Sequence, residues 1–264
     1  MPEGDTIHRA AQVLNAALAG KRVTRFETVL PQLDRVAMEG RTIERVVAAG
    51  KNLIMDFSGD LHLRTHMRMH GSWHIYRPGE RWRKRRDDMR IVIATDDYVA
   101  VAFNVPIAEL HNSHSLARND DMQRIGPDLI ADDFDEAEAI RRIRERPDEE
   151  IAEVIVNQRV VSGIGNEFKS EVLFLAGIDP FALVREVGDA KLVDLLRGAR
   201  KVMQMNVRKN RPGRASFVAL DPREKLYVYG RGGKPCRRCG TAIAYAKQGR
   251  DVRGTYWCPR CQAR

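Results

Sequence analysis

The chain has 264 residues, 43% of them hydrophobic, and a formal net charge of +9 at pH 7. This length allows one large domain or two to three small ones, and no apolar run approaches the roughly 18 residues of a membrane span. The charge is uneven, because residues 229–264 hold nine Lys/Arg and one acid while residues 1–228 hold 36 basic and 35 acidic groups. A short basic end on an almost neutral chain indicates a polyanionic partner, most simply nucleic acid.

The N-terminus is predicted to form a short helix that Asp5 caps and Gly20 ends. Its apolar positions follow helical spacing and are Ile7, Ala11, Leu14 and Leu18. The residues before it form neither the basic region nor the apolar region of a signal peptide. We therefore expect a cytoplasmic protein.

Residues 22–105 are predicted to be rich in strands. Short runs of β-forming residues alternate with turn signals, a spacing typical of a β-sandwich or barrel. The runs are Thr42–Val47, Leu53–Phe57, Ser72–Tyr76, Ile91–Ala94 and Tyr98–Phe103.

Beyond Pro127 the pattern becomes helical, with Gly and Pro residues as breaks. Helices are predicted over 136–145, 149–156, 166–176 and 190–206. The largely polar segment 208–221 is predicted to be a linker or loop. The order is therefore β-rich, then helical, then the basic end.

All four cysteines lie in that basic end, as Cys236-x-x-Cys239 and Cys258-x-x-Cys261 with 18 residues between the pairs. Two thiolate pairs at this spacing are typical of a structural zinc ribbon holding one Zn²⁺ ion. Four thiolates leave the metal no open position for water or substrate, so the zinc is expected to fold the module and not to catalyse.

Pro2 is a candidate nucleophile. Methionine before proline is normally removed, which would expose a secondary amine with a pKa of about 8. Its attack on a sugar C1′ gives an iminium that acidifies the C2′ hydrogen and permits elimination of the 3′ phosphate. The adjacent Glu3 can protonate the sugar ring oxygen and shuttle protons. Proline is common at position 2, however, so an N-terminus without chemistry is the alternative.

Three motifs occur in order along the chain: the N-terminal run 1–11, the segment 163–180 that begins Gly-Ile-Gly-Asn-Glu-Phe-Lys, and the pair 229–236 and 253–258 around the cysteines. Together they resemble the Fpg/Nei family of DNA glycosylases. The resemblance implies a multidomain α+β fold with an N-terminal helix and antiparallel β-sandwich, a helical helix-two-turn-helix domain and a C-terminal zinc ribbon.

By matching position, the resemblance implies that Pro2 is the Schiff-base nucleophile and Glu3 the general acid. Lys51 matches a lysine on a hairpin turn that contacts phosphate and helps orient the sugar, although a solvated turn lysine is the alternative. Asn166 opens a helix after a glycine turn, where its amide and backbone N–H groups can hold a phosphate. Arg253 lies on the predicted hairpin between the cysteine pairs and is suited to grip another.

The loop 66–71 is implied to fill the gap that an extruded base leaves. Met69 is the candidate wedge, with Arg68 and His70 facing the orphaned partner base; an ordinary core methionine is the alternative. The run Gly4-Asp5 fits the Nei branch better than the Fpg branch. That branch implies removal of oxidised pyrimidines and strand cleavage by β,δ-elimination.

Three further features of the sequence call for interpretation. The histidines that recur at intervals of four are too far apart along strands to share one ion, so we predict no metal site at His62, His66, His70 and His74. The basic run Arg81–Arg90 with Trp82 is either a secondary DNA surface or a solvated loop. Glu171 is either a helix-packing or capping group or a catalytic one.

We therefore expect a bifunctional DNA glycosylase and abasic-site lyase of base excision repair. Its domains would be 1–128 (catalytic), 129–228 (helix-two-turn-helix) and 229–264 (zinc finger). The expected partner is damaged double-stranded DNA, with no membrane and no nucleotide cofactor, and the protein is expected to be a monomer near the nucleoid. The alternatives are an oxidised-purine glycosylase and a non-catalytic zinc-ribbon DNA-binding protein.

Overall fold

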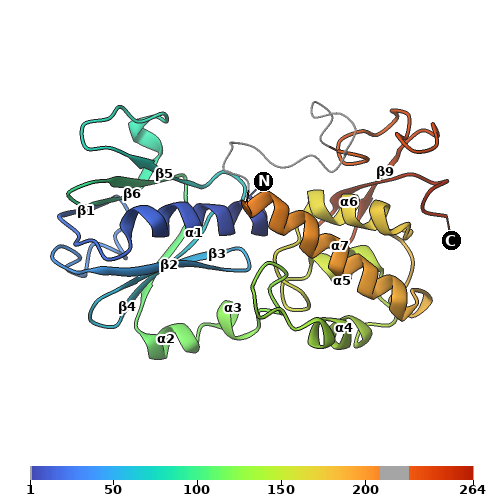
Figure 1. Ribbon diagram of the computed structural model, residues 1–264, viewed down its shortest axis with the longest axis horizontal. Helices are drawn as coiled ribbons and strands as arrows, with labels where there is room; N and C mark the ends of the chain where they lie inside the picture. The colour runs from blue at the N-terminus through green and yellow to red at the C-terminus, as the bar shows by residue number, and fades with distance from the viewer. Residues whose placement is uncertain (1, 209–225, 264) are drawn as a thin grey trace. The chain divides into compact units, whose positions relative to one another are not determined.

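The computed structural model describes residues 2–208 and 226–263, and it divides into two compact units, Met1–Arg124 and Ile125–Arg264 (Figure 1). None of the helices in the described ranges has the length and apolar character that a membrane crossing requires.

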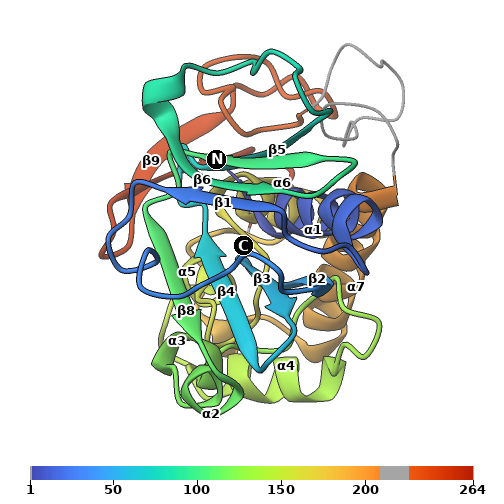
Figure 2. The ribbon, with the colours of Figure 1, turned by 90° about the vertical axis from the view of Figure 1, so that its left-hand side faces the viewer.

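The first unit is a sandwich of two antiparallel sheets (Figure 2). One sheet has the strand order β1 (Arg25–Thr28), β6 (Met89–Ala94), β7 (Val99–Phe103), β5 (Ser72–Tyr76). The other has the order β2 (Ile43–Ala49), β3 (Asn52–Phe57), β4 (Leu61–His66), β8 (Ile107–His111). Alternation along a strand assigns its side chains to opposite faces. On β5, Trp73 and Ile75 face the core between the sheets, whereas Tyr76 joins a second apolar cluster on the outer face with Val101 and Phe103.

Helix α1 (Gly4–Leu18) packs against the edge strands β2 and β5 and so closes one side of the sandwich. Its four predicted apolar positions are each 4% exposed or less. A fully buried Leu or Ile side chain contributes about 1.5–3 kcal/mol, so the start of the helix is held firmly. The N-cap, however, is Glu3 and not Asp5, which lies buried in the first turn and accepts the Thr6 N–H at 2.7 Å. Two short helices, α2 (Ser113–Ala117) and α3 (Asp120–Gln123), and the 3₁₀ turn η1 (Arg86–Asp88) complete the unit.

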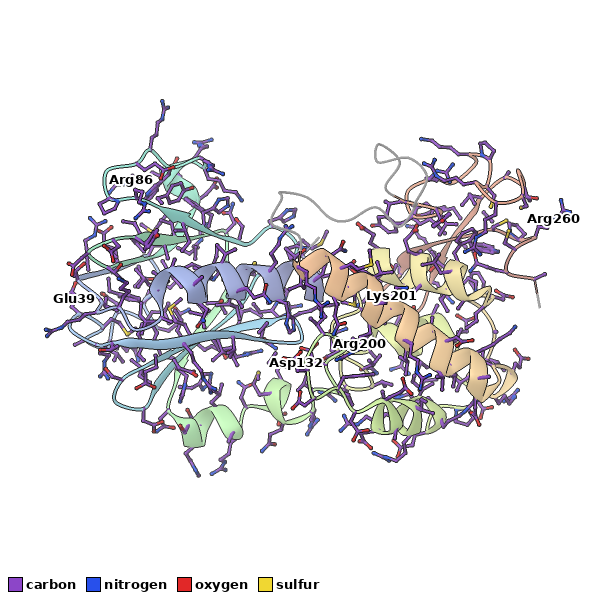
Figure 3. The ribbon with its side chains drawn as sticks, in the orientation of Figure 1. Glu39, Arg86, Asp132, Arg200, Lys201 and Arg260 are labelled. Atoms are coloured by element: carbon purple, nitrogen blue, oxygen red, sulfur yellow. The ribbon has the colours of Figure 1, made fainter. Side chains whose placement is uncertain are left out.

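Four helices form the body of the second unit: α4 (Glu136–Arg144), α5 (Ile151–Val156), α6 (Asn166–Ala176) and α7 (Asp189–Arg208), with the 3₁₀ turn η2 (Val184–Glu186). Their aliphatic faces share one core. Arg200, which Figure 3 labels on α7, donates to the carbonyls of Leu129 (2.8 Å) and Ala131 (2.6 Å). These bonds fix the segment ahead of α4. Gly177 adopts the left-handed conformation (φ +65°) that ends α6.

The C-terminal module is a hairpin of β9 (Ala244–Gln248) and β10 (Arg253–Trp257) that packs on α6. Phe174 of α6 shares a small core with Val228 and Ile243 of the module. The Glu171 carboxylate accepts the backbone N–H groups of residues 227, 228 and 229, each at 2.8 Å. Burial raises the pKa of Glu171 while these N–H groups act against that rise. Glu171 therefore attaches the module to the helical body. This agrees with the prediction that it is a packing or capping group.

The predicted fold class is confirmed, and the predicted strands and helices are present with end shifts of a few residues. The prediction omitted β1, β4 and β8, together with α2 and α3. Helix α5 begins at Ile151 and not at residue 149. The predicted linker 208–221 lies outside the described residues apart from Arg208, which ends α7. Domain boundaries at 128 and 228 stay a prediction.

Candidate active site

Pro2 and Glu3 lie directly before α1. The Glu3 carbonyl accepts the N–H groups of Thr6 (3.0 Å) and Ile7 (3.1 Å), so the backbone of Glu3 is fixed by the first helical turn. Its side chain is 1% exposed and does not cap the helix. Pro2 is half-buried. The two residues are thus held in fixed positions although they stand near the chain end, where fraying is the usual expectation.

A cavity of about 350 Å³ lies beside Pro2. Helix α1 forms one wall as far as Leu14, and Met67 with the segment 71–75 forms the other. The second wall depends on a tight turn in which the Gly71 N–H donates to the Met67 carbonyl at 2.8 Å. A Cβ at Gly71 would stand 2.5 Å from that carbonyl oxygen, so only glycine fits.

The turn between Met67 and Gly71 exposes all three predicted wedge residues, Arg68, Met69 and His70. Met69 is 62% exposed, whereas Met67 is 2% exposed and belongs to the core. The alternative that Met69 is an ordinary core methionine is therefore wrong. The core methionine of this segment is Met67. Arg68 has φ +48°, a conformation that L-residues rarely adopt and that turns the loop outward. An exposed methionine between two polar side chains suits insertion into stacked bases.

Lys51 lies on the two-residue turn between β2 and β3, where Ala49 pairs with Asn52 and Gly50 has φ +57°. The predicted hairpin position is thus observed. The turn is near the wedge loop, because Asn52 is the cross-strand partner of His66, whose Nδ1 accepts the Arg68 N–H at 3.1 Å. Burial, together with the charges of Arg68, Arg64 and Lys51, lowers the pKa of His66 to about 4. The ring is therefore neutral, and its accepting Nδ1 leaves the proton on Nε2.

Arg64 was not anticipated. It is 2% exposed, and its guanidinium donates to Asn52 Oδ1 (3.1 Å), Glu109 Oε2 (2.7 Å) and Asp121 Oδ2 (2.8 Å). Arg64 thus connects the start of β3, next to the turn that carries Lys51, with β8 and with α3. Arg64 stands among polar residues of β4, so the sequence carries no signal for such a role.

In the second unit, Asn166 and the strand of Arg253 are brought together. Asn166 is the first residue of α6, after the N-cap Gly165, and its Nδ2 donates to the Gly254 carbonyl at 2.9 Å. The Asn166 amide nitrogen therefore holds the hairpin in this structure. Its Oδ1 is buried and has no hydrogen-bond partner among the described residues. The helix start and the hairpin tip thus lie side by side, which suits a phosphate.

Arg253 begins β10 and donates from Nη2 to Asp251 Oδ2 at 2.6 Å. A buried chain of hydrogen bonds supports the same strand from beneath. Lys169 Nζ donates to Thr255 Oγ1 (2.7 Å), and Thr255 donates to Gln248 Oε1 (2.7 Å). Lys169 is fully buried. The sequence does not reveal these hydrogen bonds, since a lysine on a helix gives no sign of facing inward.

The four cysteine sulfurs lie within 4.8 Å of one another, with Cys236 and Cys261 3.9 Å apart and Cys239 and Cys258 3.4 Å apart. A tetrahedral zinc site with Zn–S bonds of about 2.3 Å places its sulfurs about 3.8 Å apart. The predicted ligands therefore fit one structural Zn²⁺.

Over residues 2–208 and 226–263, the cysteine quartet is the only group of His, Cys, Asp and Glu side chains placed to share an ion. The histidines at intervals of four have other partners: His62 Nδ1 contacts Asp56 at 2.6 Å and His74 Nε2 contacts Ser72 at 3.1 Å.

Three family models match in the order of the fold: the formamidopyrimidine-DNA glycosylase N-terminal domain over residues 1–106, its H2TH domain over 125–217, and the zinc finger found in FPG and IleRS over 233–264. The sandwich with its leading helix, the helical body and the four-cysteine hairpin define a DNA glycosylase of this kind. The chain belongs to the formamidopyrimidine-DNA glycosylase family.

Within the family, the chain is similar to proteins named as endonuclease 8. It is 37% identical over 266 residues to "Probable endonuclease 8 2" of Streptomyces coelicolor, and the match covers 100% of this chain and 94% of that protein. It is 34% identical to "DNA-(apurinic or apyrimidinic site) lyase Nei2" of Mycolicibacterium smegmatis, with 99% of each chain covered. A Lactococcus lactis Fpg complex with abasic-site DNA shares the fold, with a TM-score of 0.83, 24% identity and full coverage of both chains.

Proposed function

We propose that the chain is a bifunctional DNA glycosylase and abasic-site lyase that removes oxidised pyrimidines from duplex DNA. The observation that carries the proposal is a half-buried Pro2 that lines a cavity of about 350 Å³ and is followed directly by Glu3, which is 1% exposed. The relatives named endonuclease 8 and abasic-site lyase support the same reaction class.

The proposed reaction begins at the Pro2 nitrogen once Met1 has been removed. The nitrogen attacks C1′, the bond from C1′ to the base breaks, and the proton that the amine loses neutralises the departing base. Glu3 then donates a proton to the sugar ring oxygen as the ring opens to the iminium. The resulting iminium withdraws electrons, so the C2′ proton leaves and the bond from C3′ to its phosphate breaks. A second elimination releases the 5′ phosphate, and water then hydrolyses the iminium to free Pro2. Pro2 precedes the positive end of α1, which opposes protonation of its amine.

The other site residues are proposed to hold DNA. Lys51 contacts a phosphate near the reacting sugar, while Asn166 with the α6 start and Arg253 bind phosphates elsewhere on the strand. Met69 takes the place of the extruded base, flanked by Arg68 and His70. Zinc, when bound to the four cysteines, stabilises the hairpin that carries Arg253 and takes no part in the reaction.

Borohydride trapping on abasic-site DNA tests the chemistry. The wild-type protein is expected to form a covalent adduct through a secondary amine, and Pro2→Gly to lose most of it. Equal trapping by both proteins would refute the assignment of Pro2. Mass spectrometry of the purified protein is the control, since retained Met1 would block the amine and favour a protein that only binds DNA.

Lesion preference needs a separate comparison. We expect faster excision of thymine glycol and dihydrouracil than of 8-oxoguanine; the reverse order would assign the chain to the oxidised-purine alternative. We further propose that the enzyme acts as a monomer without a nucleotide cofactor, in the cytoplasm at the nucleoid. Sedimentation of the free protein and of its DNA complex tests the monomer.

A further inference from the structure

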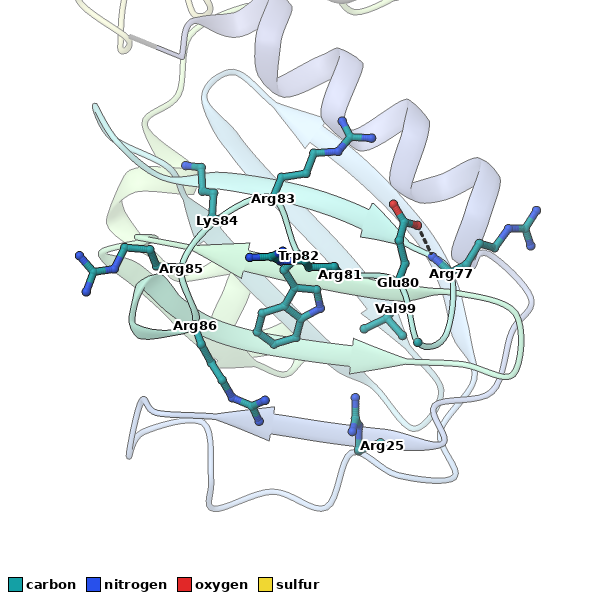
Figure 4. A pocket seen from close by; sticks show the side chains of 11 residues that line it. Arg25, Arg77, Glu80, Arg81, Trp82, Arg83, Lys84, Arg85, Arg86 and Val99 are labelled. Atoms are coloured by element: carbon teal, nitrogen blue, oxygen red, sulfur yellow. Dashed lines mark hydrogen bonds between the residues drawn. The ribbon is translucent and has the colours of Figure 1, made fainter.

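A second cavity, of about 710 Å³, lies on the outer face of the β1-β6-β7-β5 sheet (Figure 4). The loop 77–86 between β5 and β6 forms most of it, and Arg25 on β1 closes the other side. Seven of its eleven lining residues are Arg or Lys and one, Glu80, is acidic. The cavity beside Pro2 is a different one: it lies at the edge strand β5 of this sheet, against α1, and shares no lining residue with the outer cavity.

The loop presents its side chains alternately. Arg81, Arg83 and Arg85 are exposed, whereas Trp82 and Lys84 between them are half-buried. The Trp82 ring stands edge-on to Phe103 at 5.7 Å and tilted against Tyr76 at 6.5 Å. The indole is therefore fixed at the floor of the cavity, and Figure 4 shows it at the centre of the basic side chains.

Most of this positive charge has no internal counterpart. Among the described residues, the guanidinium groups of Arg81, Arg83 and Arg86 form no ion pair, whereas Arg25 pairs with Glu27 at 3.3 Å. Arg85 pairs with Asp87 at 3.0 Å, but both side chains are about 80% exposed, so the pair is weak. Like charges held together on a folded loop repel one another, and an anionic ligand relieves that repulsion.

We propose that this cavity is an accessory binding site for single-stranded DNA. The exposed arginines bind successive phosphates, and an unpaired base stacks on the Trp82 indole, over whose other face the Arg86 guanidinium lies 5.7 Å from the ring centre. A basic groove with a fixed aromatic ring is the arrangement that single strands require. A duplex keeps its bases stacked within the helix, so it could use the arginines but not the indole. The proposal does not depend on the chemistry of Pro2.

The first test is binding of a fluorescent oligothymidylate by the full-length protein at several salt concentrations. Arg81→Gln/Arg83→Gln removes two phosphate contacts, so the slope of log K against log salt should fall by about 1.4. The control is Arg35→Gln/Arg118→Gln, which removes the same charge from exposed positions outside the cavity. Equal affinities and slopes for the two double variants would overturn the proposal. Cleavage of a lesion-containing duplex should be the same in both, so failure of the accessory site is distinguishable from failure of the enzyme.

The second test concerns the indole. Oligothymidylate should quench part of the tryptophan emission, and Trp82→Leu should remove that part and weaken binding roughly 5- to 150-fold. Loss of binding in the arginine variant with no effect of Trp82→Leu would mean a surface for phosphates only, and the single-strand proposal would be wrong. If oligoglutamate binds more tightly than oligothymidylate, with the same dependence on Arg81 and Arg83, the ligand of the cavity is an acidic protein segment and the proposal of single-stranded DNA is wrong.

Discussion

Asp251 is expected to compete with DNA for Arg253, and Asp251→Asn should therefore tighten DNA binding. The two side chains are 66% and 37% exposed and their charged atoms are 2.6 Å apart. An ion pair at this exposure contributes about 0–1 kcal/mol, so its loss should change the free energy of unfolding by no more than that. A phosphate that approaches Arg253 no longer has to displace the carboxylate, and the same energy corresponds to an affinity gain of up to about five-fold.

The assay is fluorescence anisotropy with a duplex that contains a stable abasic-site analogue. Asp132→Asn is the matched control, because it removes an exposed carboxylate from the same unit without touching Arg253. In an Arg253→Ala background, the gain from Asp251→Asn should shrink to that of the control. If Asp251→Asn instead weakens binding, the carboxylate orients Arg253 for the phosphate, and the reasoning from competition is refuted.

Three further outcomes are expected. Thr255→Val removes the acceptor of the buried Lys169 ammonium and should cost roughly 1.5–3 kcal/mol in urea unfolding, whereas Thr255→Val/Lys169→Met should recover most of the loss; additive losses would contradict this. The pKa of His66 is about 4 when folded and near 6.5 when unfolded, so the unfolded state binds the proton first. The contribution of His66 to stability should be constant above pH 6.5 and be lost as the pH falls from 6.5 to 4, so His66→Gln should flatten the decline over that range; an NMR titration of His66 near 6.5 would show the reasoning to be wrong. Removal of zinc by a chelator should abolish the difference in DNA affinity between wild type and Arg253→Ala, and a persistent difference would show that the hairpin keeps its shape without metal.

Local patterns predicted the parts of the fold that depend on neighbours in the chain. The four apolar positions of α1 have the spacing of one helical face and are the residues found buried. The two cysteine pairs converge as their spacing predicts. The resemblance placed Lys51 on a hairpin turn and Arg68–His70 on a loop, and both placements agree with the structure. The chemical roles of these residues stay predictions.

Long-range contacts account for what the sequence did not reveal. Lys169 and Thr255 are 86 positions apart, and Arg64 lies 57 positions from Asp121. Neither pairing leaves a periodic signal. Strand β4 has the sequence Leu-His-Leu-Arg-Thr-His, in which polar residues hide the strand pattern. Its pairing with β3 and β8 on both sides overrides that composition. The N-cap fell on Glu3 because α1 begins earlier than cap preference suggests, with Asp5 used inside the first turn.

Strand β5 gives two surfaces a common evolutionary constraint. Trp73 and Ile75 line the Pro2 cavity, while Tyr76, on the opposite face, supports Trp82. A one-residue insertion in this strand would exchange the two faces and so disable both surfaces in a single step. The loop 77–86 is free of that constraint, since it leaves the sheet after β5 and rejoins it at β6. Homologues can therefore be expected to diversify the outer basic cavity through this loop while the strand beneath it, and with it the wall of the catalytic cavity, stays unchanged.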